Sequence, residues 1–351
     1  MIEAMSLRLP PDLLDRSAPE SSRLLALSYL AQIDAAQRRL GDSTDTEALH
    51  DFRVGLRRLR SCVRAYRRPL RGSVTEKMRQ QLRRLTQATN VGRDTEVQLD
   101  WLRKQTERMD GENTYGFFWL MGRLEGRKLD ALNPAIAEVG SEYLKVAARL
   151  RRRVGILRIE VGGNPTGKTA TFAEVSGELI GLQVARVREN LGQIRSAHDM
   201  EEAHRARIAV KRLRYLLEPI ARSNRRARAL IPRLKLAQDL LGEHHDMHVI
   251  SEMIAAARAA LSGSNGAVVP RLHPGLATLE RLAEEQAGAA FDQFHLLMRG
   301  DLADRVLTRA EEIGKALRSP VQRESEVPSL TQGPAVSEDP GGPIPLGFGR
   351  G

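Results

Sequence analysis

The chain has little cysteine, and long hydrophobic runs are missing. A single cysteine, Cys62, excludes an intramolecular disulfide framework and is typical of a reducing compartment. The sequence contains no run of about 18 apolar residues, the minimum for a membrane-spanning helix. Its first 20 residues lack the basic and apolar segments of a signal peptide. We therefore expect a soluble, cytoplasmic protein with no membrane partner.

Aromatic residues and lysine are also scarce. Aromatic residues make up 4% of the sequence, so few side chains can stack on bases, which argues against binding to single-stranded nucleic acid. The net charge is +11, and the positive charge comes from 47 arginines and only 8 lysines. Guanidinium groups pair bidentately with phosphate oxygens. The composition therefore favours a polyanion, such as nucleic acid, an acidic membrane surface or polyphosphate.

Helical periodicity runs through most of the 351 residues, which indicates an all-α protein. Short connections between successive helices are typical of antiparallel bundles. The segment over 74–110 is predicted to be one long or kinked helix. The expected helices cover residues 21–40, 45–68, 74–110, 114–131, 134–154, 171–195, 200–221, 225–262, 272–298 and 301–317.

Residues 50–64 separate charge from apolar side chains around one helix. At 100° per residue the basic side chains fall within an arc of about 80°, and an apolar stripe lies beside them. Like charges at this spacing repel, so a structural helix normally intersperses carboxylates, and this face has none. The pattern is explained either by a solvated arginine-rich surface or by a binding face. The basic residues are His50, Arg53, Arg57, Arg60 and Arg64.

The same pattern returns 154 residues later. Glu218 takes the place of Arg64, but the other basic positions are occupied again. A compositional accident would not place the same charges on the same face twice, which favours a binding face. The matching residues, in order from the position of His50, are His204, Arg207, Lys211 and Arg214.

A second segment is repeated as well. Residues 82–97 match residues 234–249, which places Arg83 over Lys235 and Arg93 over His245. Self-similarity over half of the chain predicts two copies of one helical unit.

Both motif pairs resemble those of the conserved histidine alpha-helical domain family, CHAD. The first reads H-x-x-R-x-x-x-(R/K)-R-x-R and the second L-x-x-L followed by (R/H)-D-x-x-V; the resemblance covers residues 20–318. It implies two pseudo-symmetric antiparallel four-helix bundles, with basic helices facing each other across a groove or pore. It also implies binding of inorganic polyphosphate and association with polyphosphate granules. Some members carry a further domain with an ExExK signature, which this sequence lacks, so we expect neither catalysis nor a cofactor.

The expected organisation follows from the helical pattern and the resemblance. An irregular segment (1–19) precedes the first bundle (20–154), and a linker (155–170) leads to the second bundle (171–318). A tail rich in proline, glycine and serine (319–351) is expected to be disordered.

The predicted polyphosphate contacts combine both basic faces with neighbouring helices. Arg58 and Arg212 point about 80° away from the stripe and are weaker candidates. The histidines at the start of each stripe either bond phosphate or hold helices together. The full set is His50, Arg53, Arg57, Arg60, Arg64, Arg83, Arg93, His204, Arg207, Lys211, Arg214, Lys235 and His245.

Three other functions compete with this interpretation. Residues 162–169 match the phosphate-loop pattern GxxxxGK[ST], which would require a parallel sheet of βαβ units around it. His244, His245 and His248 resemble a metal cluster, although no third ligand has a forced position and we expect no metal. The basic groove would also suit nucleic acid. We expect a non-enzymatic polyphosphate-binding protein.

Overall fold

The computed structural model describes residues 9–42, 45, 47–89, 93–156, 169–262, 269–298 and 301–319. These residues are helical almost throughout and contain no β-strand, so the predicted all-α class is confirmed. A short 3-10 helix, Thr106–Arg108, follows α4. The α-helices are α1 (Ala18–Arg39), α2 (Ala48–Ala65), α3 (Glu76–Ala88), α4 (Arg93–Gln105), α5 (Asn113–Gly155), α6 (Phe172–Gly192), α7 (Met200–Ile220), α8 (Arg225–Ser262), α9 (Val269–Met298) and α10 (Asp301–Arg318).

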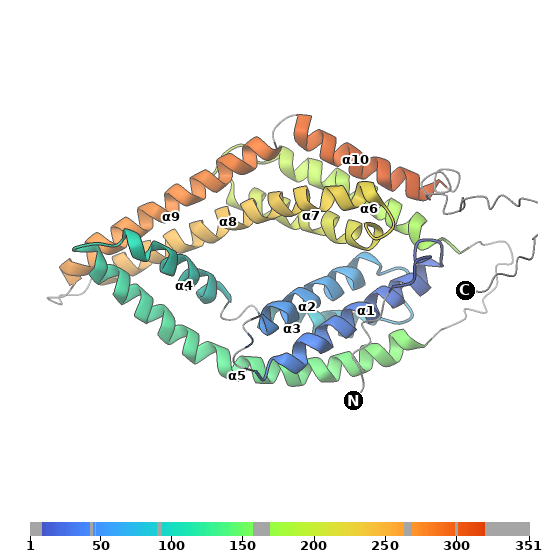
Figure 1. Cartoon of the computed structure of the whole chain (residues 1–351), viewed down its shortest axis with the longest axis horizontal. Coiled ribbons are helices and arrows are strands. Elements are labelled where there is room, and N and C mark those ends of the chain that lie inside the picture. Colours follow the sequence, from blue (N-terminus) through green and yellow to red (C-terminus); the bar gives the residue numbers. More distant parts are fainter. Residues whose placement is uncertain are drawn as a thin grey trace, which may run out of the picture.

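Two of the predicted helix boundaries are wrong. Residues 113–155 form one helix, α5, where a break before residue 134 was expected. A proline inside a helix removes one backbone hydrogen bond and bends the helix rather than ending it when packing supports both sides. Figure 1 shows α5 bending along its length. Conversely, the expected helix over 74–110 is divided into α3 and α4.

Several predictions fall on residues that the structure does not describe. They concern residues 157–168, which include all but the last residue of the phosphate-loop pattern, and residues 320–351 of the expected tail. The βαβ context that a phosphate loop needs is not found in the described part of the chain, because that part has no strand.

The helices surround the middle of an elongated molecule (Figure 1). On one side α1 packs on α2, and on the other side α6 packs on both α7 and α10. The long helices α8 and α9 pair along their length, and α9 also contacts α5. Helices α2 and α7, which carry the two repeated motifs, contact each other. The topology therefore brings the two motifs together from opposite halves of the sequence.

The hydrophobic residues form two cores, and each draws on both halves of the chain. The larger core contains side chains of α1, α2 and α3 together with α6, α7 and α10. The smaller core joins α4 and the start of α5 to the later part of α8 and to α9. The two halves are thus packed into one another, and the division into two separate bundles stays a prediction.

The apolar stripe of α2 is buried as predicted. Phe52, Leu56 and Leu59 are completely inaccessible to solvent, and Val63 is 2% exposed. Burying one such side chain contributes roughly 1.5–3 kcal/mol relative to leaving it in water. Cys62 is also buried, and burial raises the pKa of its thiol. This stripe holds the helix rigidly, so the basic stripe beside it has a defined orientation.

A backbone contact joins α5 to α9. Gly275 lies so close to α5 that an added Cβ atom would stand 2.1 Å from the carbonyl oxygen of Asn113. Gly116 approaches α9 in the same way, with the carbonyl oxygen of Leu272 at 2.4 Å from an added Cβ. Only glycine fits at these two positions, because real Cβ atoms do not approach other atoms so closely.

Candidate functional site

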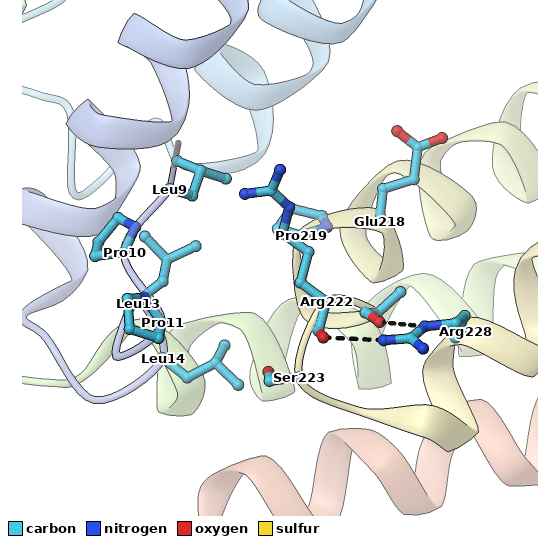
Figure 2. Close-up of a pocket in the computed structure, with 11 residues that line it drawn as sticks. Leu9, Pro10, Pro11, Leu13, Leu14, Glu218, Pro219, Arg222, Ser223 and Arg228 are labelled. Carbon is cyan, nitrogen blue, oxygen red and sulfur yellow. Dashed lines mark hydrogen bonds between the residues drawn. The ribbon is translucent and has the colours of Figure 1, made fainter. Parts of the chain in front are cut away.

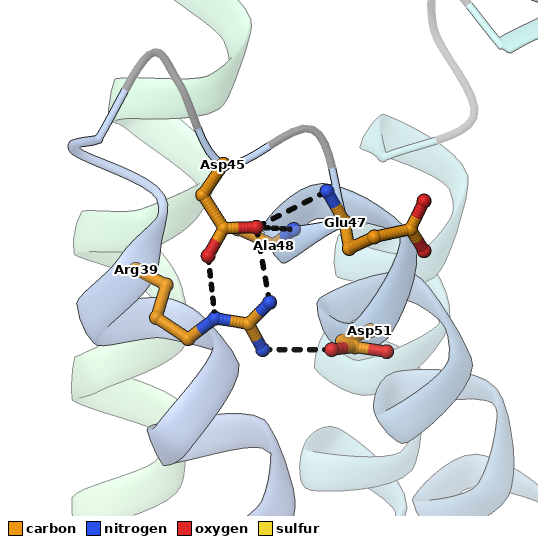
Figure 3. Close-up of polar contacts among 5 residues, drawn as sticks. All are labelled: Arg39, Asp45, Glu47, Ala48 and Asp51. Atoms are coloured by element: carbon orange, nitrogen blue, oxygen red, sulfur yellow. Dashed lines mark hydrogen bonds and ion pairs between the residues drawn. The ribbon is translucent and has the colours of Figure 1, made fainter.

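The start of α2 is held against α1 by the carboxylate of Asp45 (Figure 3). Its Oδ1 accepts hydrogen bonds from the backbone nitrogens of Glu47 (3.1 Å) and Ala48 (3.0 Å). Arg39 of α1 donates from Nε to Asp45 Oδ2 (2.7 Å) and from Nη1 to Asp51 Oδ2 (2.7 Å). Asp45 thus satisfies backbone donors at the start of the helix. The guanidinium bond lowers the pKa of the Asp45 carboxyl.

The basic stripes of α2 and α7 face each other. Arg57 of α2 lies among Arg207 and Arg214 of α7 and Arg93 of α4. Lys211 of α7 interacts electrostatically with Arg57 as well as with its own helix neighbour Arg207. We call the whole group the basic cluster. Its members are Arg57, Arg60, Arg64, Arg83, Arg93, Arg186, His204, Arg207, Lys211, Arg212, Arg214 and His245.

Burial and mutual repulsion weaken proton binding within the basic cluster. Burial, followed by the nearby arginines, lowers the pKa of Lys211 to about 8. The same causes lower the pKa of Arg212 to about 10. Burial likewise lowers the pKa of Arg57, with added repulsion from the neighbouring guanidinium groups. The free protein therefore holds these cations at an electrostatic cost, which a bound anion would remove.

Most cations of the basic cluster form no ion pair with a carboxylate among the described residues. Of its arginines and its lysine, Arg214 alone forms an ion pair with a described carboxylate, Glu218. The Nε atoms of Arg57, Arg207 and Arg214 are buried and contact no described acceptor. A buried donor without an acceptor costs free energy, so these groups suit an anionic ligand.

Arg207 owes its position to a glycine on α8. A Cβ atom at position 242 would lie 3.1 Å from Nη2 of Arg207, so its guanidinium rests directly on α8 at Gly242. Asp246, one turn further along α8, lies near Arg207 and His245, and burial raises the pKa of its carboxyl. The second repeated segment therefore forms one wall of the basic cluster.

The structure places the two repeated histidines differently. The ring of His204 lies 5.5 Å from the ring of His245. Burial lowers the pKa of His204, and both His245 and Arg207 add to the shift. His50, by contrast, is exposed on α2 and is not among the residues that interact within the basic cluster. Of the two repeated histidines, His204 therefore belongs to the basic cluster and His50 does not.

Two further residues of the predicted contact set are placed outside the cluster. Arg53 is only 5% exposed, and it donates from Nε to the carbonyl oxygen of Thr89 and from Nη1 to Glu96 Oε2, both at 2.7 Å. Lys235 is exposed and pairs with Asp239 on its own helix at 2.9 Å. Arg53 is thus engaged by neighbouring elements and Lys235 by its own helix, and neither they nor His50 interact within the basic cluster. Contact of these three residues with polyphosphate stays a prediction.

The basic cluster also contains Arg212, which was a weak candidate from the sequence, and Arg186, which the sequence did not indicate. Arg212 interacts with Arg64, Arg186 and Arg60, so its offset of about 80° does not remove it from the site. Arg186 comes from α6, outside either repeated motif. No sequence signal marks it, since it follows an ordinary amphipathic pattern. Arg58, the residue that matches Arg212, instead donates from Nε to Glu218 Oε2 at 3.2 Å.

Comparison with known proteins agrees with the sequence motifs. A family model described as CHAD domain matches residues 25–255. The chain belongs to the CHAD family. The crystal structure of the CHAD domain from the plant Ricinus communis is 21% identical, with a TM-score of 0.54, and the match covers 88% of this chain and 96% of that chain. PptA from Streptomyces chartreusis is 15% identical, with a TM-score of 0.63, and the match covers 81% of this chain and 100% of that chain. At these identities, the two structures establish a shared fold. No curated protein sequence matches the chain.

The three neighbouring histidines of this CHAD protein point to different partners. His244 is buried, and its Nδ1 and Nε2 each lie 3.0 Å from a carbonyl oxygen, of Ala287 and Ala197 respectively. His245 faces the ring of His204, and His248 Nε2 lies 3.3 Å from Glu252 Oε1. The described side chains contain no group of three or more metal-ligating residues.

No described helix of this CHAD chain combines the length and the apolar character needed to cross a bilayer.

Proposed function

We propose that this chain binds inorganic polyphosphate between α2 and α7 and does so without catalysis. The observation that carries the proposal is the pair of Arg57 and Arg207 within the basic cluster, whose buried Nε donors contact no described acceptor and which form no ion pair among the described residues. Polyphosphate bears about one negative charge on each phosphorus, so a linear chain can meet successive arginines from both helices. Each contact is a charge-assisted hydrogen bond.

The surroundings of the basic cluster favour polyphosphate over nucleic acid. The aromatic side chains on α2 and just after it, Phe52 and Tyr66, are buried in the hydrophobic core and cannot stack on bases. The guanidinium of Arg214 lies over the ring of Tyr215, 4.8 Å from the ring centre, so this ring already forms a cation–π contact. Among the described residues, the cluster thus offers charge and hydrogen-bond donors, whereas Phe52, Tyr66 and Tyr215 give it no free aromatic ring for stacking. Membership of the CHAD family supports the same ligand, and association with polyphosphate granules would follow from it.

A competition experiment tests the ligand. Long-chain polyphosphate, duplex DNA, single-stranded RNA and ATP are compared for binding to the full chain at matched ionic strength. We expect polyphosphate to bind most tightly, with an affinity that falls steeply with salt as counterions are released. Duplex DNA that equals or exceeds polyphosphate at physiological salt would contradict the proposal.

A pair of double variants tests the position. Arg57→Gln with Lys211→Gln removes two cations from the centre of the cluster. Arg188→Gln with Lys315→Gln removes the same two charges from α6 and α10, where both side chains pair with Glu311. We expect the first pair to weaken polyphosphate binding by at least about a hundredfold, because two hydrogen bonds to charged groups at roughly 1.5–3 kcal/mol each amount to about 3–6 kcal/mol. Equal losses in the two double variants would refute the assignment.

A further inference from the structure

Two contacts between α2 and α7 that the repeat relates to each other differ in charge. Arg58 of α2 meets Glu218 of α7, with Nε and Oε2 3.2 Å apart. The repeat matches Arg58 with Arg212 and Glu218 with Arg64, and these two matching residues also interact. One contact is therefore an ion pair, and its counterpart joins two arginines. Arg186 of α6 adds a third cation to the second contact.

Glu218 neutralises the cations at its own end. Its Oε2 pairs with Arg58, and its Oε1 lies 3.4 Å from Nη1 of Arg214. The Glu218 side chain is only 14% exposed, so solvent screens its charge less than it would at an open surface. A phosphate chain that continued past Arg214 would meet this carboxylate and would lose two guanidinium partners to it.

The surface beyond Glu218 is largely apolar. A cavity of 610 Å³ lies there, between the N-terminal segment and the turn from α7 to α8 (Figure 2). Apolar side chains, among them Leu13, Leu14 and Pro219, line much of it. Arg228 at its edge donates to the backbone carbonyl oxygens of Ala221 and Arg222, each at 3.0 Å. These apolar walls and this occupied guanidinium do not compensate a phosphate group for lost hydration, which leaves the exposed Arg222 as the lining cation that a phosphate could meet there.

The matching contact, between Arg64 and Arg212, has the reverse character. Arg64 and Arg186 are exposed, and Arg212 is half-buried between them. None of the three forms an ion pair with a carboxylate of the described residues. A polyanion that leaves the centre of the cluster toward this end therefore gains further cationic partners and meets no described carboxylate.

We propose that Glu218 closes one end of the polyanion path, so that a polyphosphate chain enters and leaves the basic cluster at the end formed by Arg64, Arg186 and Arg212. This inference rests on the proposed function and refines it, since a pore open at both ends would let a chain pass through. In a path with one open end, the bound segment is limited in length. Glu218 is then the residue that sets how many phosphates the site holds.

The experiment compares polyphosphates of increasing chain length on three forms of the full chain. Glu218→Gln removes the closing charge but keeps the size and hydrogen-bonding capacity of the side chain. Glu311→Gln makes the same change in net charge on α10, where Glu311 pairs with Arg188 and Lys315 outside the cluster. Thermal unfolding of each variant verifies that the contact between α2 and α7 survives.

In the wild type, we expect affinity to stop rising beyond a short chain length. In Glu218→Gln the plateau moves to longer chains, and the plot of log affinity against log salt steepens by about one to two units, because Arg58 and Arg214 become free for phosphate. Glu311→Gln leaves both measurements as in the wild type.

Arg186→Gln supplies a second test, at the open end. We expect Arg186→Gln to bind long polyphosphate chains about threefold to tenfold more weakly than the wild type does, because one exposed charge-assisted contact is lost. An unchanged plateau and salt slope in Glu218→Gln, or unchanged binding in Arg186→Gln, refutes the single open end while the proposed function stands. If the wild type binds polyphosphate of none of the chain lengths, both the single open end and the proposed function are refuted.

Discussion

Lys211 is the member of the basic cluster that loses its charge between pH 7 and pH 9. Burial and the surrounding arginines lower its pKa to about 8 in the free protein, from an ordinary value of 10.5. A bound phosphate favours the ammonium form, so binding is accompanied by proton uptake once the free side chain has lost its proton. At pH 7 about nine tenths of free Lys211 is charged, and at pH 9 about one tenth. We therefore expect polyphosphate affinity to fall about tenfold between these two pH values.

Isothermal titration with long-chain polyphosphate measures this loss, because its internal phosphates stay ionised throughout the range. Titration in buffers of different ionisation enthalpy reports the proton uptake directly. In Lys211→Arg the side chain stays charged at pH 9, so the tenfold loss should disappear while binding at pH 7 is kept. A loss of the same size in Lys211→Arg would refute the assignment of the pH dependence to Lys211.

The stability of the free protein should change in the opposite direction. Between about pH 8 and the ordinary lysine pKa of 10.5, the unfolded chain holds a proton at Lys211 that the native chain has released. The free energy of unfolding therefore rises with pH through this window, and the cost of the buried charge is fully present below it. Lys211→Gln removes this contribution, so the difference in stability between the variant and the wild type narrows as pH rises.

Three further predictions concern other parts of the molecule. Because burial lowers the pKa of His204 and His245, polyphosphate affinity should rise as pH falls from about 7 to about 5.5, and His204→Gln with His245→Gln should flatten that profile in the same titration. Arg53→Met leaves the Glu96 carboxylate without its ion-pair partner and should lower the free energy of unfolding, measured in urea, by about 3–5 kcal/mol. A decrease below about 1 kcal/mol would mean that the buried pair does not stabilise the fold. Gly275→Ala forces a methyl group onto the backbone of α5 and should cost about 1–3 kcal/mol in the same assay, whereas unchanged stability would contradict the close crossing of α5 and α9.

Much of the architecture was predictable because helical periodicity is a local property. The spacing of Phe52, Leu56 and Leu59 predicts which side of α2 is buried, and all three are in the core. The repeated motifs predict the CHAD family, and the family model confirms it. The basic residues that face each other, such as Arg57 and Lys211, were likewise identified from their matching positions on two helices.

The sequence by itself determined which residues share a face of one helix. Only the tertiary structure decided which residue of another helix lies opposite each of them. Arg53 and Arg57 belong to the same stripe, yet Arg53 is buried against Glu96 while Arg57 faces α7. Glu218 and Arg186 take their roles from contacts between helices that are more than a hundred residues apart from α2 along the chain. The physical reason is that periodicity orients a side chain around its own axis, whereas ion pairs depend on the crossing and register of two packed axes.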